Sequence, residues 1–203
     1  MKKRGKFIVF EGIDGSGKTT QIELLAKRFA ECGVKVETTC EPSDGPIGKL
    51  LRQVLKGDVV TNDESVAALF LADRMDHIRR ENGLLAMLEE GKTVLCDRYY
   101  FSSYAYHSVT MDMDYVIAAN EIAARRLKPD VTIFFDISAE ESYARITQNR
   151  ETVELFEKRE RLEKTREKYF EAFEKLKQKE KIVIIDASRS PEAIAEDVWE
   201  ALS

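Results

Sequence analysis

The feature that most constrains this chain is a glycine-rich turn that joins a short apolar run to an amphipathic helix. The run Phe7–Phe10 has the length and composition of a buried strand. Directly after it, residues 12–19 read Gly-Ile-Asp-Gly-Ser-Gly-Lys-Thr, which fits the phosphate-binding loop (P-loop) pattern. Apolar residues then recur at helical spacing, at Ile22, Leu25 and Phe29. This order of strand, turn and helix predicts a site for a nucleoside triphosphate.

Each part of the turn has a chemical task. Glycines let the backbone curl so that successive N–H groups point at phosphate oxygens, and the helix N-terminus adds its partial positive charge. We expect Lys18 to reach the β- and γ-phosphates of the nucleotide and the hydroxyl of Thr19 to bind Mg²⁺. The residues expected to bind the nucleotide are contiguous: Gly12, Ile13, Asp14, Gly15, Ser16, Gly17, Lys18, Thr19 and Thr20.

The composition is that of an ordinary globular protein. The chain has 203 residues, of which 43% are hydrophobic and 34% are charged. This length predicts a single domain over residues 1–203 with a full core. The formal net charge of −5 argues against nucleic acid as a partner, because surfaces that bind nucleic acid are usually basic.

The cysteines and apolar runs indicate where the protein works. Its three cysteines lack metal-ligand spacing, and Cys96 lies inside an apparent strand, where we expect a buried free thiol. The longest apolar run, Val66–Ala72, is far shorter than a membrane span. No signal-peptide pattern follows the basic N-terminus. We therefore expect a cytoplasmic protein with no membrane partner.

Strand-like runs alternate with helical patterns along the whole chain. Five runs carry few polar residues, as strands covered on both faces do. They are Phe7–Phe10, Val34–Thr39, Thr93–Cys96, Val131–Phe135 and Ile182–Ile185. Right-handed crossovers make a parallel sheet the economical arrangement. The sequence predicts an α/β fold of the P-loop NTPase type, with a five-stranded parallel sheet, helices on both faces and a short lid segment.

Two long helices are also expected. Asn62 and the residues after it form a helix start, and the helix could run to about Glu90, with a bend at Gly83. Residues 154–181 combine an apolar stripe with charges four positions apart, which include the pairs Glu157 with Arg161, Glu160 with Lys164 and Glu171 with Lys175. This pattern favours a surface helix over a coiled coil.

Polar residues follow the predicted strands where ligands of open α/β sheets bind. Glu41 follows the second strand, Asp97 and Arg98 follow the third, and Asp136 and Asp186 follow the last two. An acidic residue beside a P-loop can hold Mg²⁺, so we expect Asp97 to share the metal with the loop threonine. The planar guanidinium of Arg98 can hold a phosphate through two hydrogen bonds.

Four segments together resemble the thymidylate kinase family. They read Phe-Glu-Gly-x-Asp-Gly-x-Gly-Lys at 10–18, Glu-Pro at 41–42, Phe-x-x-Asp-Arg at 70–74 and Asp-Arg-Tyr-x-x-Ser-Ser-x-Ala-Tyr at 97–106. Their order and spacing match the family over nearly the whole chain. The resemblance implies a kinase that transfers the γ-phosphoryl group of ATP to dTMP to give dTDP. It also implies a homodimer.

The resemblance also implies residue roles for binding the acceptor. Phe70 would stack on the thymine ring, and Arg74 would hydrogen-bond its carbonyl oxygen. Ser103 would contact the base, directly or through water, and Tyr106 would pack against the sugar where a 2′-hydroxyl would otherwise sit. Asp14 would contact the 3′-hydroxyl side of the sugar. The remaining residues expected at the substrate are Glu41, Arg98 for the 5′-phosphate, and Ser102.

Position 16 bears on the source of a catalytic cation. Some family members have an arginine inside the P-loop, whereas this chain has Ser16. Members that lack the loop arginine resemble this chain and supply arginines from a lid after the fourth strand, here about residues 145–155. Arg145 and Arg150 are the candidates, and Arg150 is favoured for reaching the γ-phosphate. The expected catalytic set is therefore Lys18, Arg98, Arg150, Arg145 and Asp14.

Two other functions stay open at this point. A deoxynucleoside kinase acts on a 5′-hydroxyl and needs a carboxylate base, for which Glu41 is available. A P-loop module without catalysis would bind nucleotide as a switch. His107 stands where relatives commonly have glutamine, and we expect a surface or supporting histidine there. His77 is expected to be structural.

Overall fold

The computed structural model describes residues 4–147 and 153–202, without the side chains of residues 147 and 153–158. The strands are β1 Phe7–Glu11, β2 Val36–Cys40, β3 Thr93–Asp97, β4 Val131–Asp136 and β5 Ile182–Asp186. The helices are α1 Lys18–Glu31, α2 Pro46–Lys56, α3 Asp63–Arg79, α4 Leu84–Glu89, α5 Tyr100–His107, α6 Met113–Arg126, α7 Ala139–Thr147, α8 Val153–Leu176 and α9 Pro191–Leu202.

The strands form one parallel sheet in the order β2-β3-β1-β4-β5. The strand that carries the P-loop is therefore central, and Phe10 pairs with Asp97 on one side and Ile133 on the other. This register brings the end of β3 beside the start of the P-loop. The predicted α/β fold of the P-loop NTPase type is confirmed.

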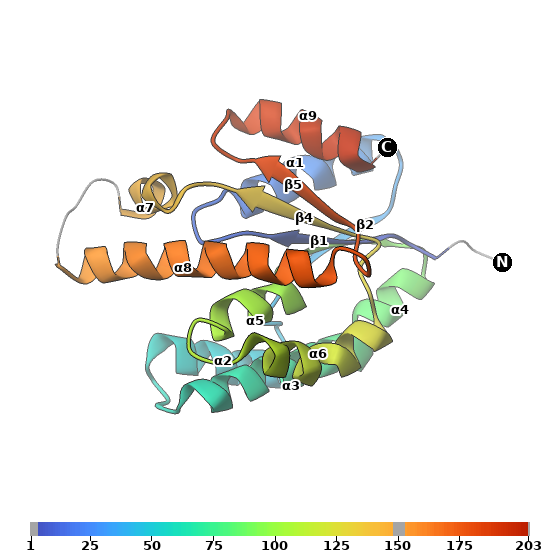
Figure 1. Ribbon diagram of the computed structural model, residues 1–203. Helices are drawn as coiled ribbons and strands as arrows, with labels where there is room; N and C mark the ends of the chain where they lie inside the picture. Colours follow the sequence, from blue (N-terminus) through green and yellow to red (C-terminus); the bar gives the residue numbers. More distant parts are fainter. Residues whose placement is uncertain (1–3, 148–152, 203) are drawn as a thin grey trace.

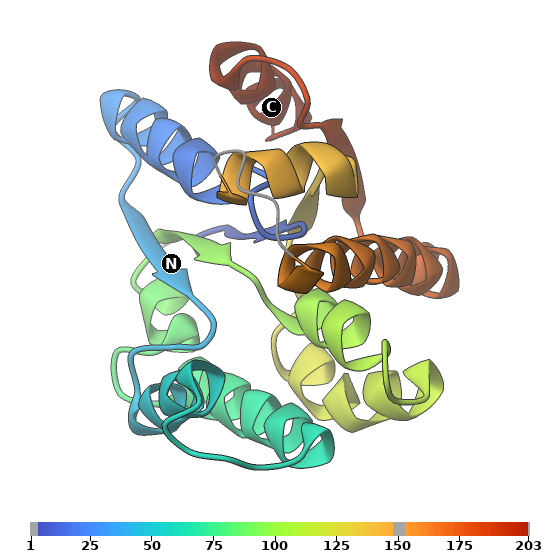
Figure 2. The same cartoon turned by 90° about the vertical axis from the view of Figure 1, so that its left-hand side faces the viewer.

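Helices cover both faces of the sheet. In Figures 1 and 2, α1 and α9 lie on one face and α5 and α8 on the other. Helices α2, α3 and α6 pack beyond α5, so the second face carries an extra helical layer. Because α5 follows β3 directly, the polar segment after β3 lies between the sheet and this layer.

Burial differs between the centre and the edges of the sheet. Every residue of β1 is buried, as are most residues of β3 and β4. The edge strands β2 and β5 each expose side chains, including Thr38 and Ile184. The expectation that all five strands are covered on both faces is wrong for these two: β2 packs against α1 and β5 against α9, and both helices lie on the same face of the sheet.

The segment 62–90 forms two helices rather than one. Asn62 caps α3 as expected, since its side chain accepts a hydrogen bond from Ser65 N at 2.8 Å. The chain then leaves the helix at Arg80 and re-enters one after Gly83. A Cβ on Gly83 would lie 2.5 Å from the carbonyl oxygen of His77, so this close turn requires glycine.

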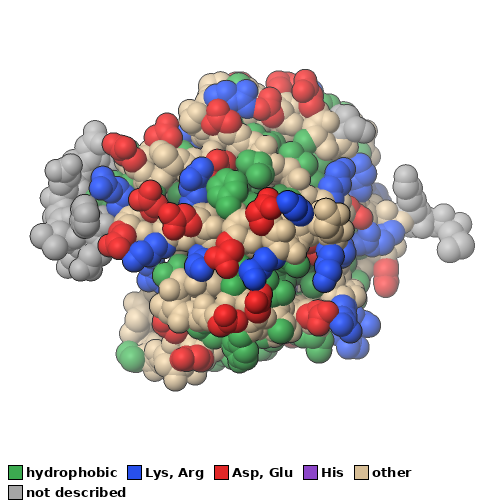
Figure 3. All heavy atoms as spheres, in the orientation of Figure 1, with side chains coloured by type: hydrophobic (Ala, Val, Ile, Leu, Met, Phe, Trp, Pro, Cys, Tyr) green, Lys and Arg blue, Asp and Glu red, His purple; other side chains and the backbone are tan. Residues whose placement is uncertain are grey.

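Helix α8 occupies most of the predicted segment 154–181. Its stripe packs into the core at Leu162, Tyr169 and Phe173. The predicted pair Glu160–Lys164 is confirmed at 2.7 Å. The pair of Glu171 with Lys175 is wrong, because their partners are Lys168 and Asp114 respectively, on the same helix and on α6. Figure 3 shows acidic and basic side chains interspersed on the visible face of the molecule.

Two further predictions concern the buried cysteine and membrane-spanning segments. Cys96 is buried and free, as expected, and burial raises the pKa of its thiol. Among the helices of residues 4–147 and 153–202, none has the length and apolar character needed to cross a bilayer.

Candidate active site

The P-loop wraps the start of α1 through three glycines with positive φ. Gly12, Gly15 and Gly17 have φ values of 149°, 77° and 90°. A Cβ on Gly12 would lie 2.7 Å from Ser16 Oγ and 2.9 Å from the carbonyl oxygen of Phe135. The loop therefore curls tightly against the end of β4, which only glycine allows at this position.

The first turn of α1 leaves its backbone donors without a side-chain cap. Gly17 is the N-cap residue, and no side chain accepts a hydrogen bond there. Unpaired N–H groups at a helix start attract anions. Thr19 and Thr20 lie exposed in this turn, whereas Ile13 and Ser16 are buried and shape the loop from inside.

Lys18 lies folded against the loop. Its Nζ donates hydrogen bonds to the carbonyl oxygens of Gly12 and Ile13, each at 3.1 Å. Burial, with the nearby positive charge of Arg98, lowers the pKa of this lysine to about 8, while Asp97 and other acids act in the opposite sense. A phosphate that replaced the two carbonyls would restore a strong interaction with the ammonium group.

The residues expected to bind Mg²⁺ fit such an ion. Asp97 Oδ1 is buried and accepts no hydrogen bond from any described residue. The hydroxyl of Thr19 is exposed at the start of α1. Within the described residues, no cluster of three acidic, histidine or cysteine side chains could hold a metal. Other ligands of the ion would come from phosphate oxygens and water, as is usual for Mg²⁺ in phosphotransferases.

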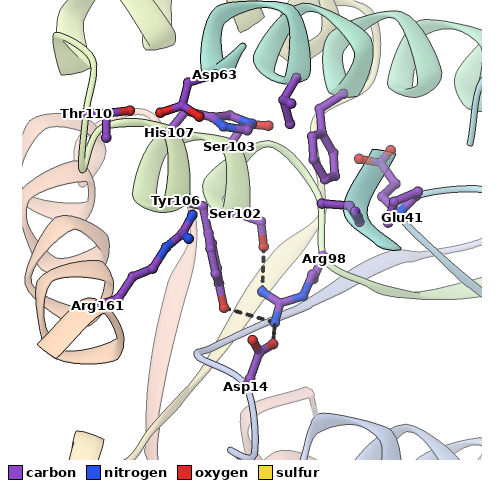
Figure 4. Close-up of a pocket in the computed structure, with 14 residues that line it drawn as sticks. Asp14, Glu41, Asp63, Arg98, Ser102, Ser103, Tyr106, His107, Thr110 and Arg161 are labelled. Carbon is purple, nitrogen blue, oxygen red and sulfur yellow. Dashed lines mark hydrogen bonds and ion pairs between the residues drawn. The ribbon is translucent and has the colours of Figure 1, made fainter. Parts of the chain in front are cut away.

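A pocket of about 280 Å³ adjoins the P-loop (Figure 4). It brings together seven residues that the sequence assigned to substrate or catalysis: Asp14, Glu41, Phe70, Arg98, Ser102, Ser103 and Tyr106. Side chains from α2, α3, α5 and α8 complete its walls. The pocket lies between the sheet and the outer helices, directly beside the phosphate-binding loop.

Arg98 is the centre of the pocket's charge network. Its backbone has φ of 68°, which turns the chain sharply out of β3. The guanidinium donates to the carbonyl oxygen of Gly12 at 3.2 Å and pairs with Asp14 Oδ1 at 2.5 Å. It also donates to Ser102 Oγ at 3.1 Å and to the hydroxyl of Tyr106 at 3.1 Å, as Figure 4 shows.

Glu11 and Tyr169 do not line the pocket, but they hold this network in place through buried hydrogen bonds. The buried Glu11 carboxylate accepts hydrogen bonds from Ser102 Oγ at 2.6 Å and from the Tyr169 hydroxyl at 2.9 Å. The Tyr169 hydroxyl lies 2.8 Å from Ser102 Oγ and 3.4 Å from Arg98 Nη1. Burial raises the pKa of Glu11, and the hydrogen bond from Ser102 is the largest influence that opposes this. Sequence reasoning missed both residues.

Arg74 lies behind the pocket wall. It is 1% exposed, and its guanidinium contacts Glu41 Oε2 at 2.7 Å, Ser103 Oγ at 3.1 Å and Asn120 Oδ1 at 2.5 Å. It does not line the pocket, although Glu41 and Ser103 do. Arg74 therefore holds two residues of the pocket wall, Glu41 and Ser103, in place.

The histidines differ in their surroundings. His77 is fully buried, with Nε2 2.9 Å from Thr39 Oγ1 and Nδ1 3.4 Å from Glu41 Oε1, so its structural role is confirmed. His107 lines the pocket instead, and its ring lies 5.3 Å from that of Phe70. Burial lowers the pKa of His107 to about 4, so the ring is neutral near pH 7.

Of the two arginines expected in a lid, the structure describes Arg145. Arg145 on α7 donates to the carbonyl oxygen of Ala187 at 2.9 Å and to that of Gly15 at 3.5 Å. It therefore bridges the P-loop and the loop after β5. Arg150 lies outside the described residues, as does the middle of the predicted lid.

Two of the acids after the strands have structural partners outside the pocket. Asp136 forms a paired contact with Arg166, with distances of 2.6 and 2.9 Å. Asp186 accepts hydrogen bonds from the backbone and hydroxyl of Ser188. The position of an acid at a strand end was therefore not enough to identify a site residue.

Comparison with known proteins identifies the family. The family model for thymidylate kinase matches residues 10–198. A "Probable thymidylate kinase" from Pyrococcus abyssi is 40% identical over 202 residues, covering 96% of this chain and 94% of the relative. One from Methanococcus aeolicus is 45% identical over 166 residues, with 81% and 77% covered. A "Thymidylate kinase" from Rhodopseudomonas palustris is 36% identical over 208 residues, with 98% and 89% covered. The chain belongs to the thymidylate kinase family.

Proposed function

We propose that this protein is an ATP-dependent kinase that transfers the γ-phosphoryl group of ATP to dTMP and so forms dTDP. The observation that carries the proposal is the pocket that joins Asp14 of the P-loop, the paired Arg98 and the ring of Phe70 in one cavity. A phosphate at the arginine would then lie beside the phosphate-binding loop, with a base at the aromatic end.

On the donor side, the uncapped start of α1 and Lys18 would bind the β- and γ-phosphates of ATP. Thr19 and Asp97 would hold Mg²⁺, which when bound neutralises charge on the phosphates. The unpaired Oδ1 of Asp97 supports this assignment. The ammonium of Lys18 would exchange two loop carbonyls for phosphate oxygens.

On the acceptor side, Arg98 would hold the 5′-phosphate of dTMP. Tyr106 would pack against the deoxyribose and Asp14 would contact its 3′-hydroxyl side. Phe70 would stack on thymine, while Ser103, Ser102 and Glu41 line the same wall. Arg74 would position Ser103 and Glu41 beside the base, because both contact its guanidinium.

The transfer itself would depend on positioning and charge neutralisation. A phosphate acceptor is already anionic near neutral pH, so no strong general base is needed. Ser16 supplies no cation, and a lid arginine would therefore stabilise charge on the moving phosphoryl group. Arg150 is the favoured residue, since the donors of Arg145 already reach two carbonyl oxygens.

The deoxynucleoside kinase alternative is not favoured. Its base would be Glu41, whose carboxylate forms a buried ion pair with Arg74 at 2.7 Å and lies 3.4 Å from His77. A carboxylate held in this way has to leave a cationic partner before it can accept a proton from a hydroxyl. A nucleotide switch without catalysis needs no pocket for an acceptor, so it does not account for the aromatic pocket beside the P-loop.

Acceptor choice tests the proposal. ADP release with ATP and Mg²⁺ is measured with dTMP, dUMP, thymidine, dCMP and AMP as separate acceptors. We expect strong turnover with dTMP, weaker turnover with dUMP and none with thymidine. The methyl group that separates the first two is worth about 1–3 kcal/mol in a fitted pocket. Turnover with thymidine would favour the Glu41 alternative, and no turnover with any acceptor would favour the switch.

The proposal includes a homodimer that works in the cytoplasm. Large apolar side chains are exposed on α2 at Leu50 and on α6 at Tyr115 and Ile122, which would suit a contact between copies. Light scattering of the purified chain tests the oligomeric state. A molar mass equal to the 23.2 kDa of one chain would contradict the dimer.

A further inference from the structure

The pocket has one cation to which the roles above give no task. Arg161 lies on α8 and lines the pocket. Figure 4 shows its side chain directed from α8 toward Tyr106 and the cavity. Its guanidinium forms no hydrogen bond or ion pair with any residue that the structure describes. Glu157, which the sequence pattern pairs with Arg161, has a side chain outside the described residues. An arginine that faces a pocket and has no partner among the described residues is available to an anionic ligand.

The other charges of the pocket are already balanced. Asp14 pairs with Arg98, and Glu41 pairs with Arg74. Asp63 lies in the first turn of α3, where the helix N-terminus stabilises a negative charge. Among the described residues that line the pocket, Arg161 is therefore the cation whose charge no acidic side chain balances.

We propose that Arg161 binds the 5′-phosphate of the acceptor nucleotide together with Arg98. This proposal rests on the proposed dTMP kinase function. Arg98 is fixed on the P-loop side, and its Nη2 lies 3.1 Å from the Tyr106 hydroxyl. Arg161 approaches the same tyrosine from α8.

Chemistry supports two arginines at one phosphate. The group has three terminal oxygens, while the donors of Arg98 already serve Gly12, Ser102, Tyr106 and Asp14. A second guanidinium supplies donors that no described residue engages, with the planar geometry that suits phosphate. The proposal thus makes α8 a substrate-binding helix as well as a packing helix.

The test compares a ligand that has the phosphate with one that lacks it. Binding of dTMP and thymidine to the full chain is measured by calorimetry, without ATP, for the unmodified protein and for Arg161→Ala. We expect dTMP to bind about 10- to 100-fold more weakly to the variant, as for the loss of a charged hydrogen bond. Thymidine should change by less than about twofold, and Arg161→Lys should fall between the two proteins.

Two control variants make the result specific. Lys164→Ala removes a cation one turn away on α8 that is paired with Glu160, and it should bind both ligands normally. Asp63→Asn tests whether Arg161 acts instead by forming an ion pair with Asp63 across the pocket. If Asp63→Asn weakens dTMP as much as Arg161→Ala does, the phosphate role is overturned.

The remaining outcomes separate this proposal from the proposed function. Equal weakening of dTMP and thymidine by Arg161→Ala would overturn the phosphate role while leaving the dTMP kinase assignment intact. If the unmodified protein neither binds dTMP nor phosphorylates it, the proposed function fails and this proposal fails with it. Arg161 is exposed, so its replacement should not change the thermal unfolding temperature.

Discussion

Arg98 Nη2 and Asp14 Oδ1 lie 2.5 Å apart although 84 positions separate them in the sequence. One comes from the turn after β3 and the other from the P-loop after β1. The two strands are neighbours in the sheet, so their carboxyl ends meet. This contact ties the group expected to hold the acceptor phosphate to the loop expected to hold the donor phosphates.

Replacing Arg98 with alanine should lower kcat/KM for dTMP by about 100-fold or more, since two charged hydrogen bonds of about 1.5–3 kcal/mol each would be lost. Arg98→Lys should recover only part of the loss, because an ammonium cannot donate in the same planar pair. Steady-state kinetics measures both. Lys177→Ala removes an exposed cation paired with Glu174 and should behave as the unmodified enzyme. An Arg98→Ala enzyme with normal kcat/KM would remove this residue from the site.

Replacing Arg150 with alanine should lower kcat by about 10³-fold while ATP affinity changes little, because an arginine that stabilises charge on the moving phosphoryl group acts mainly in the transition state. Arg145→Ala is the comparison, with a smaller effect on kcat, since its donors reach backbone carbonyls. Turnover at saturating ATP and dTMP measures the difference. Equal turnover in Arg150→Ala and the unmodified enzyme would contradict the role.

ATP binding should weaken as pH rises above 8. The pKa of Lys18 in the free protein is lowered to about 8, mainly by burial, so the lysine loses its charge above that pH. Bound phosphates favour the charged form, and ATP affinity should then fall by up to about tenfold per pH unit. Titration of ATP between pH 7 and 9.5 measures this. Lys18→Arg should give a flat profile, because arginine stays protonated.

The same lysine should affect stability in the opposite direction. Its folded pKa lies below the ordinary value of 10.5, so the unfolded chain binds more protons between pH 8 and that value. Below pH 8 the charged, buried Lys18 lowers the free energy of unfolding by its full amount. This penalty shrinks as pH rises through the window, so the free energy of unfolding increases with pH. Comparing urea unfolding of the unmodified protein and Lys18→Met at pH 7.5 and 9.5 measures the contribution of Lys18 to the free energy of unfolding. A difference between them that stays constant with pH would contradict the lowered pKa.

Breaking the buried pair of Arg74 and Glu41 should be costly. Arg74→Ala leaves a carboxylate that is 4% exposed without its cation, and we expect a loss of about 3–5 kcal/mol in the free energy of unfolding. The double variant Arg74→Met with Glu41→Leu should lose less, because no buried charge remains unpaired. Urea unfolding measures both. Arg125→Ala, which breaks an exposed pair with Glu121, should cost no more than about 1 kcal/mol.

Replacing Tyr169 with phenylalanine should reduce catalysis with only a modest loss of stability. The change keeps the ring in the core but removes a hydroxyl that contacts Glu11, Ser102 and Arg98. Because Tyr169 would act by positioning Arg98, we expect KM for dTMP to rise about tenfold while KM for ATP stays unchanged. Tyr106→Phe removes the other hydroxyl beside the guanidinium and serves as a comparison. An equal rise in both KM values would indicate a structural effect alone.

The local parts of this protein could be predicted from sequence because each has a short-range signature. The P-loop at residues 12–19, the cap at Asn62 and the apolar runs of the five strands depend on neighbours in the chain. The break at Gly83 was less well defined, since only the close approach of the His77 carbonyl shows that one helix becomes two. Strand-end position also indicated Asp136, whose partner on α8 gives it a structural task.

The tertiary structure alone decided which side chains meet. Nothing near Glu11 in the sequence indicates that its carboxylate accepts a hydrogen bond from the hydroxyl of Tyr169, 158 positions away. Tyr169 belongs to the apolar stripe of α8, so its position in the sequence indicates only a core residue. Arg74 likewise has an amide oxygen of Asn120 as a partner, which no spacing predicts. Local sequence supplies the chemistry that is available: a phosphate-binding loop, and acids and arginines after the strands. The sheet order and the packing of α5 and α8 decided which of these groups share a pocket, because contacts between distant segments exist only after the chain has folded.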